Sequence, residues 1–198
     1  QPIIEAGFKK WAENIIANGV PHKNWNLFQA DFIVKIALIL QDNQAYADGK
    51  GKQYYLDYVV NQNSIRQWSL NKLIDFGFDQ KAKTWYESPG YSTTVLSTLC
   101  DFANMLDEKA EIDMFKQRPI LIGGVKTSVE YLFPNRMIAG FGDTHPGYLN
   151  QGGINNIQKY ATRHKNKRLI ADMNLFKSAV SSDAPVSEIE KYTSTMFY

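Results

Sequence analysis

The sequence predicts an all-α protein of paired antiparallel helices, an arrangement found in α/α toroids and solenoids. Apolar residues recur at helical spacing along most of the 198 residues, and no alternating pattern typical of strands persists. Polar loops of varied length separate these stretches, which fits helix pairs. Because no fixed period relates the stretches, they do not form a simple repeat array.

The first three helices are predicted from their apolar spacing and their boundaries. Residues 4–16 carry one apolar stripe, which ends at Asn18-Gly19. Residues 28–40 carry a second stripe. Residues 54–59 begin a third helix after the turn predicted at Gly49-Lys50-Gly51.

The middle of the chain predicts three further helices. Residues 65–74 suggest a fourth helix, less cleanly spaced, that closes at Gly77. Residues 95–106 have the clearest helical pattern in the chain. Residues 125–132 predict a shorter helix that Pro134 stops.

The last third of the chain begins with a change in composition. Residues 140–148 are rich in glycine and proline and predict a structured loop. Helices are expected to resume over 154–164 and 169–180. Residues 181–185 form another predicted loop, and Ser187 offers an N-cap for a final short segment.

Composition limits the classes of protein that fit. The length suits one domain, and 44% hydrophobic with 21% charged residues is ordinary for a globular chain. A net charge of +2 is too small to indicate a nucleic-acid binder. The basic run Arg163–Arg168 is read as the solvated end of a helix, with a site for an anionic polymer as the alternative.

Cys100 is the only cysteine, so no disulfide framework is expected, and its apolar neighbours predict a buried thiol. No apolar run approaches the length of a membrane span. The sequence opens at Gln1 without methionine, which is expected of a processed product or of a piece of a longer enzyme.

Three polar, aromatic loops between predicted helices are candidates for chemistry: residues 22–26, 85–92 and 141–148. Loops on one side of a ring of helix pairs converge on one cleft. Trp25 and Trp85 would provide flat walls for that cleft. The polar side chains that the loops supply are Asn24, Asn26, Glu87, Tyr91, Asp143, His145 and Tyr148.

These side chains suit proton abstraction from the carbon next to a carboxylate. Asn donates hydrogen bonds to a carboxylate without adding charge, and Tyr or His can act as acid or base. A proline and glycine precede Tyr91 at the start of an apolar helix, which gives its phenol a fixed backbone. His22, His145 and His164 lack metal-ligand spacing, so no metal site is expected. No cofactor is expected either, since both standard phosphate-binding glycine patterns are absent.

Two motifs resemble those of a known family. Asn24-Trp25-Asn26-Leu27-Phe28 precedes one helix, and Glu87-Ser88-Pro89-Gly90-Tyr91 opens a later one. They resemble the heparinase II/III-like polysaccharide lyases, most closely the heparinase III branch, and the likeness extends over about residues 1–180. It implies an incomplete α/α toroid that cleaves a uronic-acid polymer, with a heparan sulfate-like one favoured.

The resemblance implies that Asn24 neutralises a uronate carboxylate and that Tyr91 moves the protons of a β-elimination. Three departures stand beside this implication. Trp25 occupies a position where the family has His, and Ser92 follows the tyrosine. The family also carries a catalytic His on a C-terminal β-sandwich, so that domain is expected in a longer parent chain. A bacterial periplasmic or secreted location is implied as well.

Each candidate also has a structural interpretation. Tyr91 could be an ordinary helix-start residue, and Asn24 an N-cap. Trp25 and Trp85 could serve packing, and Glu87 could stabilise the helix dipole. Asp143 and His145 are expected to contact substrate but could as readily satisfy loop amides. Asn26 is expected to contact substrate. A glycoside hydrolase that uses Glu87 and Asp143, or a binding module without chemistry, remains an alternative.

Overall fold

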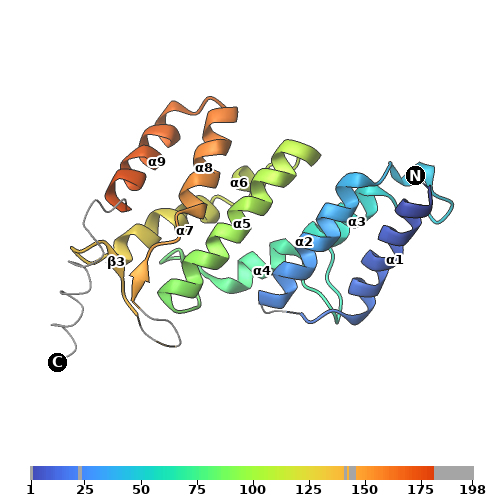
Figure 1. The fold of residues 1–198 in the computed structure, drawn as a ribbon, viewed down its shortest axis with the longest axis horizontal. Coiled ribbons are helices and arrows are strands. Elements are labelled where there is room, and N and C mark those ends of the chain that lie inside the picture. Colours follow the sequence, from blue (N-terminus) through green and yellow to red (C-terminus); the bar gives the residue numbers. More distant parts are fainter. Residues whose placement is uncertain (1, 22–23, 141, 143–145, 181–198) are drawn as a thin grey trace. The chain divides into compact units, whose positions relative to one another are not determined.

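The computed structural model describes residues 2–21, 24–140, 142 and 146–180. It divides the chain into two compact units, Gln1–Phe78 and Asp79–Tyr198, and each is described by itself. The predicted all-α class is confirmed, because helices dominate the described residues and only two short two-stranded sheets accompany them (Figure 1). The toroid stays a prediction. None of the described helices is both long and apolar enough to cross a membrane.

The described residues of the first unit form four α-helices. The first three lie within about four residues of the predicted bounds, whereas the fourth begins at Leu70, later than the predicted start at Ile65. Helix α2 packs against both α1 and α3, and α3 packs against α4. Ser69 caps α4, its hydroxyl accepting a hydrogen bond from the Lys72 amide at 3.1 Å. The elements are α1 (Pro2–Asn18), α2 (Asn24–Ile39), the 3₁₀ turn η1 (Asn43–Ala45), α3 (Lys52–Asn61) and α4 (Leu70–Gly77).

Part of the apolar stripe that locates α1 and part of the one that locates α2 are exposed. Ile4 and Trp11 on α1 are 63% and 52% exposed, whereas Ala12 beside them is fully buried. The Trp11 ring stacks on Phe32 of α2, with centroids 5.9 Å apart, at the surface. Large apolar residues therefore lie on both the inner and the outer sides of α1 and α2.

The second unit is built around the long helix α5, which packs against α7 and α8, while α8 packs against α9 (Figure 1). Cys100 on α5 is fully buried, as predicted, and burial raises the pKa of its thiol. The elements are β1 (Phe78–Asp79), β2 (Thr84–Trp85), α5 (Pro89–Ala110), α6 (Met114–Gln117), α7 (Ile120–Ser128) with the 3₁₀ turn η2 (Val129–Tyr131), β3 (Met137–Ile138), β4 (Gly147–Tyr148), α8 (Gly152–Arg163) and α9 (Lys167–Val180).

Two glycines allow α8 to begin in close contact with its neighbours. A Cβ on Gly152 would lie 1.8 Å from the Ser97 hydroxyl oxygen of α5. A Cβ on Gly153 would lie 2.8 Å from a methyl carbon of Val125 on α7. A larger residue at either position would push α8 away from the core.

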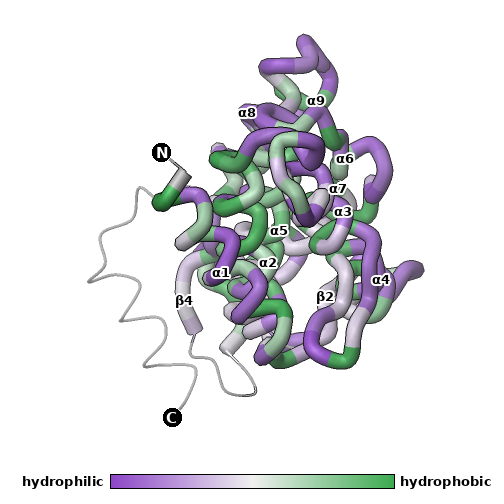
Figure 2. The backbone as a smooth tube through the Cα atoms, turned by 90° about the vertical axis from the view of Figure 1, so that its right-hand side faces the viewer, coloured by the Kyte–Doolittle hydropathy of each residue, from purple (hydrophilic) through white to green (hydrophobic). Residues whose placement is uncertain are grey.

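The basic run Arg163–Arg168 lies at the end of α8 and in the turn before α9, and it is exposed, as predicted. This turn is drawn in the hydrophilic colour in Figure 2. Arg163, the first residue of the basic run, also takes part in a group of polar side chains between α5 and α8, called here the polar seam. Arg163 donates to the side-chain oxygen of Asn104 at 2.9 Å and to the Asp107 carboxylate at 2.7 Å. Asn104 in turn donates to the backbone carbonyl of Asn156 at 2.6 Å.

The Asp107 carboxylate should make the stability of this seam depend on pH. Burial alone would raise its pKa, but hydrogen bonds from His164 and Arg163 outweigh burial and hold the pKa below the ordinary value. A depressed folded-state pKa stabilises the fold above the ordinary Asp value of about 4. That contribution is lost as the pH falls through the folded-state pKa.

We expect Asp107→Asn to lower the free energy of unfolding at pH 7 by about 1–2 kcal/mol, since Arg163 and His164 are partly solvated. Urea unfolding at pH 7 and again below about pH 3 measures the difference, which should shrink at the acid pH. The control is Asp101→Asn, the same change at an exposed position of α5. A difference that is equal at both pH values would contradict the ion-pair explanation.

Candidate functional site

Tyr91 occupies the position that the sequence predicts, in the first turn of α5. Pro89 is the first helical residue, where its missing N–H costs no helix hydrogen bond. Ser92 and Thr93, which follow Tyr91, are buried and fix the helix start, and the Ser92 amide donates to the Ser88 carbonyl at 2.8 Å. Tyr91 itself is 43% exposed. A phenol therefore faces solvent from a rigid backbone.

Trp85 and Glu87 form a local pair next to this helix start. The indole N–H of Trp85 donates to the Glu87 carboxylate at 3.0 Å. Trp85 is only 8% exposed, so its ring packs into the unit and is not an open wall for a sugar. This burial favours the packing role of Trp85, and its substrate contact stays a prediction. Glu87 is exposed, and its carboxylate lies just before a helix N-terminus, where negative charge is favourable.

The glycine-rich loop after residue 140 reaches the same helix start. β3 pairs with β4 in antiparallel register, with Met137 opposite Tyr148, and Tyr148 is 47% exposed. Gly142 in the connecting loop has φ +72°, and a Cβ there would lie 3.3 Å from Cβ of Ser88. Two of the three predicted loops thus approach each other at Ser88, three residues before Tyr91. Asp143 and His145 lie outside the described residues, and their roles stay predictions.

The first unit carries the other candidates. Asn24 is the first residue of α2 and is half-buried. Trp25 is 66% exposed, and its ring meets Phe28 edge-on with centroids 6.0 Å apart. Trp25 is therefore open to a ligand, unlike Trp85.

Asn26 has a structural role within the first unit, and its substrate contact stays a prediction. It is fully buried, and its side-chain amide clamps the backbone of Trp68, the residue before the N-cap of α4. The Asn26 Nδ2 donates to the Trp68 carbonyl at 2.9 Å, and its Oδ1 accepts from the Trp68 amide at 2.8 Å. Both polar groups of the side chain are thus satisfied within the first unit.

Asn24 and Tyr91 belong to different units, so a cleft that they share stays a prediction. Within the second unit, a half-exposed phenol lies on the helix start that follows Glu87 and that Gly142 approaches at Ser88. Such a set can move a proton at the surface, since a phenol is a possible general acid or base.

One group of side chains in the described part of the chain could hold a metal ion, although the sequence indicates no metal site. Ligand atoms of Asp107, Asp113 and His164 lie within 4.8 Å of one another. Each is already engaged: Arg163 and His164 contact the Asp107 carboxylate, and the Tyr160 hydroxyl donates to Asp113 at 3.0 Å. Burial, followed by the hydrogen bond to Asp113, raises the pKa of Tyr160 to about 12. These bonds explain the group as an ion-pair network that ties α5, α6 and α8 together.

Comparison with known proteins gives one match. A family model described as "Endo-acting ulvan lyase 2nd domain" matches residues 81–184. Searches of curated proteins and of solved structures find no match. The matched range covers more than half of the chain, including Tyr91 and every element from β2 to α9.

Proposed function

The chain belongs to the family of the endo-acting ulvan lyase 2nd domain, and from this membership we propose that it serves the endo-acting cleavage of ulvan by β-elimination. Membership makes the chain a polysaccharide lyase domain. The observation that carries the finer proposal is that the matched residues include a solvent-facing Tyr91 at a rigid helix start. The heparinase III-like motifs at Asn24 and Glu87–Tyr91 support the same class of reaction.

The proposed elimination needs a base, an acid and a donor to the uronate carboxylate from the protein. A base removes the proton from the sugar carbon next to the carboxylate. The electron pair forms a double bond to the neighbouring carbon, whose bond to the glycosidic oxygen breaks, and an acid protonates that oxygen. Tyr91 would move these protons. Asn24 would donate to the carboxylate, which takes up charge as the proton leaves.

Two uronate polymers are candidates for the substrate. The sequence motifs favour a heparan sulfate-like polymer, and the description of the matched family favours ulvan. A lyase of this type needs a carboxylate next to the carbon that loses its proton, so both polymers are proposed to carry uronate at the cleaved linkage. We give ulvan preference because the family match covers more of the chain than the two motifs do.

The assay follows the ultraviolet absorbance of the unsaturated uronate product, using the intact protein with ulvan, heparan sulfate, chondroitin sulfate and alginate. We expect absorbance to rise with ulvan while the viscosity of the polymer falls early, as endo-acting cleavage requires. New reducing ends without absorbance would instead indicate a hydrolase, in which Glu87 and Asp143 would be the carboxylate pair. A binding module without chemistry would give neither signal, and the exposure of Tyr91 already disfavours that alternative.

A further domain and a location belong to the same proposal. The words "2nd domain" in the family description support a chain that works together with another domain. We expect that domain to be a C-terminal β-sandwich with a further catalytic His. A polymer of this size is met outside the cytoplasm, so a periplasmic or secreted location is proposed.

The role of Asn24 gives a direct prediction. Asn24→Ala removes an uncharged donor to the uronate carboxylate and should lower kcat/KM by about a hundredfold, as loss of one donor to a developing oxyanion does. Initial rates of product absorbance on ulvan measure it. Asn14→Ala, an exposed asparagine on α1, is the matched control and should leave the rate unchanged. Activity of Asn24→Ala within about twofold of wild type would exclude this role.

A further inference from the structure

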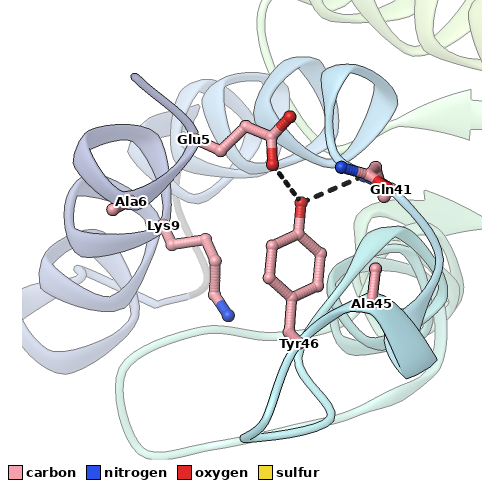
Figure 3. Close-up of a pocket in the computed structure, with 6 residues that line it drawn as sticks. All are labelled: Glu5, Ala6, Lys9, Gln41, Ala45 and Tyr46. Atoms are coloured by element: carbon pink, nitrogen blue, oxygen red, sulfur yellow. Dashed lines mark hydrogen bonds between the residues drawn. The ribbon is translucent and has the colours of Figure 1, made fainter. Parts of the chain in front are cut away.

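A pocket of about 440 Å³ opens in the first unit, and its lining includes none of the residues that the motifs single out (Figure 3). One wall comes from α1 and the other from the segment that follows α2. Two alanines leave the space open, while the remaining side chains are polar or aromatic. The lining residues are Glu5, Ala6, Lys9, Gln41, Ala45 and Tyr46.

Hydrogen bonds fix the polar groups of this pocket before any ligand arrives. The Tyr46 hydroxyl donates to the Glu5 carboxylate at 3.0 Å and accepts from the Gln41 backbone amide at 3.1 Å (Figure 3). Burial raises the pKa of Tyr46, the Gln41 amide partly offsets this, and Glu5 raises it further. The phenol therefore stays protonated and holds Glu5 in place. Such preorganisation lowers the entropy cost of binding.

The Lys9 ammonium is held in place by Asp48 and by the ring of Tyr46. Its ammonium donates to the Asp48 carboxylate at 2.7 Å and lies 4.1 Å from the centroid of the Tyr46 ring. The hydrogen bond from Lys9, more than any other interaction, lowers the pKa of Asp48. The Lys9 side chain is only 14% exposed, so the pocket presents a fixed cation with donors to spare.

The groups left for a ligand are complementary to hydroxyls. Glu5 is 8% exposed, and only one of its carboxylate oxygens is engaged by Tyr46, so the other can accept a hydrogen bond. Lys9 can donate one. Asp48 is not part of the lining, but its ion pair with Lys9 offsets the ammonium charge. The charge of Glu5 is then left unbalanced and disfavours an anion. Since sugar hydroxyls both donate and accept, we propose that this pocket binds an uncharged sugar unit.

This proposal adds a second kind of saccharide contact to the chain. The elimination proposed for Tyr91 and Asn24 concerns a uronate, whereas this pocket would select against one. It does not depend on the lyase activity, because it concerns binding by the first unit alone. A polymer in which acidic and neutral sugars alternate could use both sites.

The test uses two ligands that share one pyranose ring and differ at C6: methyl glucoside, with a neutral hydroxymethyl group, and methyl glucuronide, with a carboxylate. Each is titrated into the intact chain, and NMR shifts of Lys9, Tyr46 and their neighbours are recorded. We expect the glucuronide to bind about fivefold more weakly than the neutral glucoside, as expected for one nearby like charge in water. Glu5→Gln should reduce that difference to less than about twofold.

Two matched variants separate the pocket from the rest of the surface. Ala45→Trp fills the space and should abolish the shifts, whereas Ala17→Trp, at an exposed position of α1 outside the pocket, should retain them. The Tyr91→Phe variant should also retain them, which separates this proposal from the elimination. Glucuronide binding as tight as glucoside binding would overturn the proposal. So would the absence of shifts at these residues, or shifts that survive Ala45→Trp.

Discussion

Replacing Tyr91 by phenylalanine should lower kcat on ulvan by about 10²- to 10⁴-fold, the range expected when a general acid–base group is lost. The change removes a single oxygen and leaves the ring in place. Because Tyr91 is 43% exposed and its neighbours Ser92 and Thr93 anchor the helix start, the fold should keep its stability to within about 0.5 kcal/mol. A loss of rate would then be a loss of chemistry.

The matched control is Tyr86→Phe, which makes the same change at a tyrosine that is 65% exposed on the same segment. Product absorbance under saturating ulvan gives kcat, and the substrate dependence gives KM. An effect confined to KM would assign Tyr91 to binding. Full activity of Tyr91→Phe would remove the phenol from the proposed elimination and leave the family membership untouched.

Long, regular elements follow from the sequence because their signals are repeated many times. The apolar spacing over 95–106 lies within α5, and the Ser88-Pro89 pair marks the start of that helix. Gly77 ends α4, as predicted. In contrast, α6 has four residues and each strand has two, which is too short for any periodicity to appear. Strand β4 falls within the segment predicted only as a structured loop, and β3 lies just before that segment.

Burial was harder to predict than helix position. A stripe of apolar residues locates a helix, but the packing of its neighbours decides which side is covered. Helix α1 buries Ala12 and most of Glu5 while Trp11 stays half exposed. Side chains from separate elements also make up the Glu5–Tyr46 pocket and the Asp107–His164 network. No spacing along the chain could indicate either of them.

The asparagines at 24 and 26 show the same limit within one motif. Two positions apart on a helix, their side chains point about 200° apart, so they face different surroundings. The sequence offered both as substrate contacts. The structure buries Asn26 completely and leaves Asn24 half-buried at the start of α2. Only tertiary packing distinguishes the one that can meet a polymer.

Asn26→Ala should therefore be among the most destabilising single changes in the first unit. It removes the side chain that bonds to the amide and the carbonyl of Trp68 at a part-buried place, and each such loss costs about 1–3 kcal/mol. We expect the free energy of unfolding to fall by about 2–4 kcal/mol in total. Urea unfolding followed by circular dichroism measures this loss, and hydrogen exchange at the Trp68 amide reports the clamp directly.

Asn14→Ala serves again as the control, because this exposed asparagine on α1 should change the stability by less than about 0.5 kcal/mol. The KM of folded Asn26→Ala for ulvan at low temperature separates the two roles, since a structural clamp leaves substrate affinity intact. An unchanged urea midpoint together with a raised KM would restore Asn26 as a substrate contact. A lowered midpoint with unchanged KM would leave Asn24 as the asparagine of this motif that is available to a uronate.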